Sequence, residues 1–177
     1  MRPAANRPRV VVFGIGNPSR GDDALGPLLL ERLERLSAPW VDIECVPAFQ
    51  LQVENALDLV GRDLALFVDA AASGPAPFAL LPVVPAPTTG ITTHALAPGV
   101  VLAVYEQIHH QPPPPAFTLA VRGNEFELGA PLSPLATKNL EAAWAEMVRL
   151  LARPEAAVWT AGSAGAPAIT PPGFRNA

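Results

Sequence analysis

Residues 13–26 read FGIGNPSRGDDALG, and this stretch marks a junction between a strand and a helix. The run Val10–Phe13 that leads into it is β-branched and aromatic, which is typical of a buried parallel strand. Leucines at helical spacing follow the stretch, at positions 25, 28, 29, 33 and 36. We therefore expect the first strand-to-helix loop of an α/β domain, and in open α/β sheets ligands bind beyond the carboxyl ends of the strands. Gly14, Gly16 and Gly21 are expected to be structural, because glycine allows close backbone approach and positive φ.

The loop lacks the patterns that bind nucleotides. Gly14 and Gly16 fit a G-x-G-x-x-G fingerprint, but Ser19 stands at the third glycine position, and no G-x-x-x-x-G-K-S/T motif is present. Asp22 and Asp23 near the helix start suit the helix dipole but would repel a pyrophosphate. A tight turn with one aspartate as helix N-cap explains the pair equally well, and the second aspartate is then free for chemistry.

The composition indicates one globular domain in a reducing compartment. The chain has 177 residues, of which 50% are hydrophobic and 16% are charged. Its net charge of −4 argues against a nucleic-acid partner. A single cysteine, Cys45, excludes an internal disulfide, and its place in the strand-like run 41–46 predicts a small core residue. We see neither a signal-peptide pattern nor an apolar run of ~18 residues, and we expect a cytoplasmic protein without a membrane span.

Strand-like and helix-like segments alternate along the chain. Strands are predicted over 9–16, 41–46, 64–68 and 116–122, with an edge strand at 79–81 in a proline-rich segment. Helices are predicted over 23–36, 51–59, 98–109 and 134–151, the last with Ser133 as N-cap. This order predicts a three-layer α/β/α sandwich with a mostly parallel, twisted sheet. We expect one domain over 9–152, an N-terminal extension at 1–8 and a poorly ordered C-terminal tail at 153–177.

Three candidate metal ligands stand at predicted loops. Asp23 follows the first strand, Asp69 directly follows the apolar strand 64–68, and His94 lies in a polar loop. If the two strands are neighbours, both carboxylates converge at the carboxyl edge of the sheet. Two carboxylates and an imidazole suit Ni²⁺, Zn²⁺ and similar ions. The alternatives are that Asp69 caps a turn and that His94 is an ordinary loop residue.

Five motifs, in order, resemble the signature of the hydrogenase maturation endopeptidases. They are Gly14-Ile15-Gly16-Asn17, Asp22-Asp23-Ala24-Leu25-Gly26, Val68-Asp69-Ala70, Thr93-His94, and the segment 122–134 with its RG, ELG and LSP elements. The resemblance covers about residues 9–151 and implies a phosphorylase/hydrolase-like α/β fold. Members of this family remove the C-terminal peptide from the precursor of a [NiFe] hydrogenase large subunit and recognise the nickel that it carries.

The resemblance also implies roles for particular residues. Asp23, Asp69 and His94 match the family's metal ligands and are the candidate catalytic residues, and zinc and cadmium are alternative occupants of such a site. The substrate-binding loop comprises Gly14, Gly16, Asn17, Arg20 and Asp22. The implied partner is the large-subunit precursor, without nucleic acid or membrane, and we expect a monomer in isolation.

The sequence departs from the family at one point and leaves rivals open. Many members carry a Gly-Gly-Thr turn after the second strand, where this chain has PAFQL at 47–51, so we expect a subset of the family. Peptidyl-tRNA hydrolase also opens with a Gly-x-Gly-Asn-Pro loop, but its following Tyr and Arg-His-Asn are replaced here. A non-catalytic metal- or protein-binding module of the same fold is the other rival. The metal can either assist hydrolysis or serve recognition only, with a carboxylate as general base.

Overall fold

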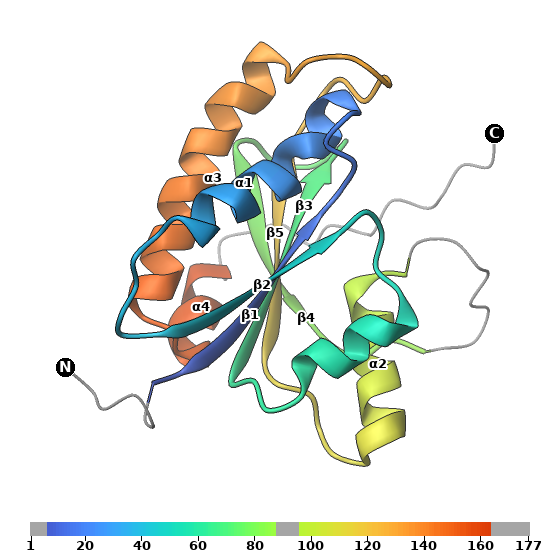
Figure 1. The fold of residues 1–177 in the computed structure, drawn as a ribbon, viewed down its shortest axis with the longest axis vertical. Helices are drawn as coiled ribbons and strands as arrows, with labels where there is room; N and C mark the ends of the chain where they lie inside the picture. Colours follow the sequence, from blue (N-terminus) through green and yellow to red (C-terminus); the bar gives the residue numbers. More distant parts are fainter. Residues whose placement is uncertain (1–6, 88–95, 164–177) are drawn as a thin grey trace.

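A five-stranded sheet forms the centre of the molecule (Figure 1). The structure, a computed structural model, describes residues 7–87 and 96–163. The strand order is β2-β1-β3-β5-β4, and only β4 is antiparallel to its neighbour. The bounds are β1 (Arg9–Ile15), β2 (Asp42–Ala48), β3 (Leu64–Ala71), β4 (Phe78–Val83) and β5 (Ala116–Arg122). The mostly parallel sheet with an added edge strand is confirmed.

Helices cover both faces of the sheet, which confirms the three layers. One face carries α1 (Leu25–Glu34), α3 (Pro134–Ala152) and α4 (Ala156–Ser163). The other carries the 3₁₀ helix η3 (Val53–Leu59) and α2 (Pro98–His109). A short 3₁₀ helix, η2 (Gly21–Ala24), precedes α1. Within the two described ranges, no helix has the length and apolar character needed to cross a bilayer.

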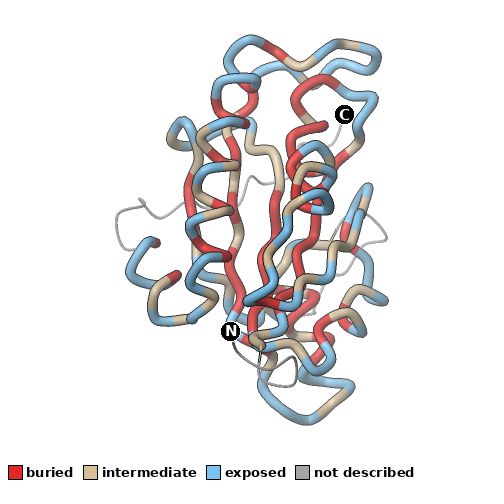
Figure 2. The backbone as a smooth tube through the Cα atoms, turned by 60° about the vertical axis from the view of Figure 1, so that its left-hand side comes forward, coloured by how far each residue is buried: buried red, intermediate tan, exposed pale blue. Residues whose placement is uncertain are grey.

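Alternate residues of the two central strands face opposite helical layers, because side chains in a strand have a period of two. Val10 and Leu66 belong to a first core with residues of α1, α3 and α4. Phe13 and Phe67 belong to a second core with residues of η3 and α2, and their rings stack with centroids 4.7 Å apart. Figure 2 shows this burial running along the central strands. The sheet is therefore a wall shared by two hydrophobic cores.

Cys45 packs against the first core from β2 and is half-buried, as expected of a small core residue. Burial, together with the negative charge of Glu34, raises the pKa of the Cys45 thiol to about 11. The thiol is therefore protonated at neutral pH and a poor nucleophile or metal ligand.

The strand that carries Asp69 is longer than predicted. β3 continues to Ala71, because its last residues still pair with β5, with Asp69 opposite Ala120 and Ala71 opposite Arg122. Asp69 therefore lies inside the strand, and the prediction that it follows the strand is wrong. Its position near the carboxyl end is retained.

The prediction of a poorly ordered tail from Arg153 is wrong as far as Ser163. Residues Ala156–Ser163 form α4, and Trp159 is fully buried. The indole ring packs edge-on against Phe117 at 5.5 Å, and Nε1 donates to the carbonyls of Leu150 (2.9 Å) and Arg153 (3.1 Å). A short helix of small residues shows little amphipathic period in the sequence. The burial of a single indole holds this segment against the core. Residues 164–177 lie outside the described part.

Candidate active site

The first strand-to-helix loop places Asp23 at the carboxyl end of β1. Gly16 leaves the strand with φ +136°, and a Cβ there would lie 2.0 Å from the carbonyl oxygen of Asp23. Only glycine permits this contact, which folds the chain back so that the backbone N–H of Asn17 donates to Oδ2 of Asp23 (2.8 Å). Asp23 is half-buried in η2. The structural role predicted for Gly16 is confirmed.

Gly14 belongs to the strand predicted over 9–16 and not to the substrate-binding loop, in which it was also placed. It lies buried within β1, where a Cβ would come within 2.6 Å of Cβ of Leu30 in α1. Gly26 allows a similar close approach, since a Cβ there would lie 2.2 Å from the carbonyl oxygen of Ile15. Gly14 is therefore structural, as expected of its residue type, but it supports helix packing and does not line a substrate-binding loop.

The negative charge of Asp23, which follows β1, acts on Asp69 in the neighbouring strand β3. Burial and, to a smaller extent, the negative charge of Asp23 together raise the pKa of Asp69 to about 7, against one lowering hydrogen bond from the backbone of Ala70. The two carboxylates thus converge at the carboxyl edge, as expected for neighbouring strands. Near neutral pH, Asp69 can exist in either protonation state, which is typical of a group that transfers protons or awaits a cation.

His94, the third predicted ligand, lies outside the described residues. The described chain resumes at Leu96, whose backbone N–H donates to the carbonyl of Leu51 beyond β2 (3.1 Å). Within residues 7–87 and 96–163, no group of three His, Cys, Asp or Glu side chains is placed to hold a metal ion. The three-ligand site therefore stays a prediction.

Asp22 is not a substrate-binding residue, because its side chain is fully buried and engaged. Its Oδ2 accepts from the backbone N–H groups of Asn124 (2.7 Å) and Glu125 (2.9 Å) and from the Ser133 hydroxyl (2.7 Å). Its Oδ1 accepts from the Ser133 backbone N–H (2.7 Å). Burial alone would raise the pKa of Asp22, but these hydrogen bonds together lower it.

The partners of Asp22 belong to a segment that the sequence analysis did not assign to the site. We call residues 123–133 the β5–α3 loop. Its backbone also bonds the first loop: Gly21 N–H donates to Ala130, Asp22 N–H to Glu125, and Gly129 N–H to Ser19, at 2.7–3.2 Å. The only signal for this contact in the sequence was the motif content of 122–134.

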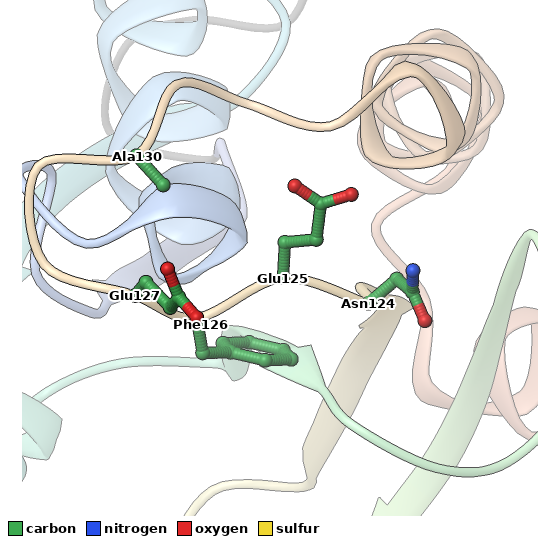
Figure 3. A pocket seen from close by; sticks show the side chains of 5 residues that line it. All are labelled: Asn124, Glu125, Phe126, Glu127 and Ala130. Atoms are coloured by element: carbon green, nitrogen blue, oxygen red, sulfur yellow. The ribbon is translucent and has the colours of Figure 1, made fainter.

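Arg20 and the β5–α3 loop lie side by side at the protein surface next to the first loop. Arg20 is exposed, and its Nε donates to the carbonyl of Phe126 (2.9 Å). A pocket of about 270 Å³ opens on the loop and is lined by Asn124, Glu125, Phe126, Glu127 and Ala130 (Figure 3). Arg20 and the half-buried Asn17 are thus on the loop surface where they were predicted, and contact with substrate by either stays a prediction.

Comparison with known proteins gives matches among solved structures. No protein-family model matches the chain, and no curated protein matches it significantly. The [NiFe] hydrogenase maturation protease HycI from Thermococcus kodakarensis KOD1 is 25% identical, with 84% of this chain and 96% of that chain covered at a TM-score of 0.63. The hydrogenase maturating endopeptidase HybD from Escherichia coli is 21% identical, with 82% and 93% covered at a TM-score of 0.62. A further endopeptidase from Escherichia coli is 24% identical, with 81% and 91% covered at a TM-score of 0.62.

These matches agree with the family predicted from the sequence motifs. They extend over nearly the whole of the matched proteins, so the likeness is that of a complete domain. The four motifs that lie in the described residues meet in space as well, because the first loop, the end of β3 and the β5–α3 loop gather at one edge of the sheet. The motifs, the fold and these matches together support a likeness to the family of [NiFe] hydrogenase maturation proteases.

Proposed function

We propose that the protein is an endopeptidase that removes the C-terminal peptide of a [NiFe] hydrogenase large-subunit precursor, with nickel carried by the precursor as the recognition signal. The observation that carries this proposal is the placement of Asp23 and Asp69 at the same edge of the sheet, where burial and, to a smaller extent, the charge of Asp23 raise the pKa of Asp69 to about 7. The reaction class is inferred from the resemblance to the family, and the Asp23–Asp69 pair is the proposed place of the reaction. We further propose a cytoplasmic location, in keeping with the single free cysteine.

The donor set fits a divalent ion such as nickel. Asp23 and Asp69 offer carboxylate oxygens, and His94 would add an imidazole nitrogen. The charged group that shifts the pKa of Asp69 is another carboxylate, and no cation of the described residues contributes to that shift. Bound nickel would supply the positive charge that offsets this repulsion.

Peptide hydrolysis consumes one water molecule at the scissile bond. The water oxygen bonds to the carbonyl carbon, the C–N bond breaks, and the released amine takes up a proton. If nickel serves recognition only and leaves Asp69 uncoordinated, Asp69 is suited to accept a proton from the water, because its metal-free pKa of about 7 lies near the operating pH. The carboxylate of Asp23 is held in place, because the backbone N–H of Asn17 donates a hydrogen bond to its Oδ2.

The test is cleavage of purified precursor with and without nickel. We expect the wild-type protein to shorten the nickel-loaded precursor, read out by intact mass and gel shift, and to leave nickel-free precursor intact. Asp69→Asn should abolish cleavage. Asp42→Asn is the matched control, because Asp42 is an exposed carboxylate at the amino end of β2, on the opposite edge of the sheet.

Two outcomes would contradict the proposal. Stable binding of the nickel-loaded precursor without cleavage would favour the non-catalytic module. Cleavage that is equally fast without nickel would remove nickel from recognition while leaving the protease activity in place.

A further inference from the structure

We propose that Asp22 is a positioning residue, which holds the Asp23 turn in register with the end of β3 and thereby sets the geometry of the Asp23–Asp69 pair. This inference rests on the proposed function. It assigns to Asp22 a task different from substrate contact, which its complete burial rules out.

Asp22 connects two distant parts of the chain. Its carboxylate accepts three backbone N–H bonds and one hydroxyl bond, all from the β5–α3 loop and all at 2.7–2.9 Å. Asp22 and Asp23 are consecutive in η2, a single 3₁₀ turn of four residues. A shift of the Asp22 side chain therefore moves the backbone that carries Asp23.

The β5–α3 loop starts beside the strand that carries Asp69. Arg122, the last residue of β5, pairs with Ala71 of β3, and the Gly123 N–H donates to the carbonyl of Ala71 (2.9 Å). A Cβ at Gly123 would lie 2.8 Å from Cβ of Asp22, so the Gly123 backbone lies directly against the Asp22 side chain. Asp22 is thus anchored to the exit of β3 and β5, two residues beyond Asp69.

The Asp22 carboxylate cannot be replaced by the corresponding amide without disturbing its hydrogen bonds. All four partners of Asp22 are donors, so the NH₂ group of an asparagine would face donors at one of the two oxygen positions. The bonds that the backbone makes between the two loops, at Gly21, Asp22 and Gly129, do not need this side chain. Asp22→Asn should therefore loosen the Asp23 turn while the β5–α3 loop stays in place.

The experiment measures kcat and KM separately with the nickel-loaded precursor. We expect Asp22→Asn to lower kcat by about 10- to 100-fold, the loss typical of a slightly misplaced catalytic group, with KM within about 3-fold of wild type. Trp159→Phe is the matched control, because it removes two buried hydrogen bonds next to Phe117, at the opposite end of β5. All assays are run at a temperature where circular dichroism shows every variant folded. Trp159→Phe should lower the melting temperature and leave kcat near wild type.

A second pair of variants covers the case in which Asp22→Asn does not fold. Ser133→Ala removes one of the four donors to Asp22, and Ser133→Thr keeps the hydroxyl. We expect Ser133→Ala to lower kcat by about 3-fold or more and Ser133→Thr to restore it.

The proposal is overturned if Asp22→Asn has the same kcat as Trp159→Phe. It is also overturned if Asp22→Asn raises KM and leaves kcat unchanged, which would make Asp22 an element of substrate binding. Should Asp22→Asn not fold, a wild-type kcat for Ser133→Ala overturns it. A wild-type protein that cleaves nothing would instead refute the proposed function, so the two failures are distinguishable.

Discussion

The Asp22 carboxylate and the Ser133 hydroxyl lie 2.7 Å apart, although 111 positions separate them in the chain. The same hydroxyl accepts the backbone N–H of Ala136 (3.1 Å) and so caps α3. One serine therefore caps the last long helix and stabilises a buried carboxylate in the first loop through a hydrogen bond. The contact makes the Asp23 turn depend on the correct docking of a helix from the far end of the domain.

Replacing Gly16 should disrupt the site through the backbone. Gly16→Val combines a positive φ of +136° with a Cβ that would clash with the carbonyl oxygen of Asp23. We expect a loss of stability of ~3 kcal/mol or more, because strained φ alone accounts for ~1–3 kcal/mol. Urea denaturation measures it. Gly129→Ala is the control, with a positive φ of +80° and nothing within 4 Å of its Cβ. An equal loss in both variants would contradict the role of the Asp23 contact.

Removing the Trp159 side chain should detach α4 from the first core and destabilise the fold. Trp159→Ala deletes a fully buried indole and two hydrogen bonds, and large-to-small changes of this kind destabilise by ~3–5 kcal/mol. Thermal and urea melts measure the loss. Thr160→Ala, at an exposed position on the same helix, should change stability by less than ~0.5 kcal/mol. A near-neutral Trp159→Ala would show that α4 contributes little to the fold.

Deprotonation of Asp69 should lower the stability of the folded protein as the pH rises. The pKa of Asp69 is raised to about 7 in the folded state, so its bound proton stabilises that state fully below an unfolded pKa near 4. This contribution, up to ~4 kcal/mol, is lost as the pH rises through about 7. Asp69→Asn should lose less stability than wild type between pH 4 and pH 8 in metal-free buffer. Parallel stability curves for the two proteins would contradict the raised pKa.

Asp23 and His94 should matter to processing and not to folding. Asp23→Asn keeps the size of a half-buried side chain but removes its charge, and His94→Ala removes an imidazole. We expect each to fold with a stability close to wild type and to weaken metal affinity by ~10-fold or more. Each should leave the large-subunit precursor uncleaved in cells, read by gel shift beside a melting curve. Full processing by either variant would refute its assignment as a ligand.

The sequence predicted the sheet because its central strands are strongly apolar. The runs 10–13 and 64–68 could be buried only as inner strands, and Ser133 with Pro134 marked the start of α3 at the right residue. The two neighbouring aspartates could not be told apart in the same way. What separates them is a loop that arrives more than 100 residues later and buries Asp22 but leaves Asp23 half-exposed. Local patterns carry no information on such a contact.

The two hydrophobic cores share β1 and β3, and this has a consequence for how the molecule opens. Because alternate residues of each strand belong to opposite cores, neither helical layer can leave without exposing side chains of the same two strands. Local openings should therefore be confined to the periphery, such as β4 and η3, while amide protons of β1 and β3 exchange with solvent only through global unfolding. The carboxylate pair is built at the ends of these strands, so we expect its scaffold to persist through local openings elsewhere in the domain.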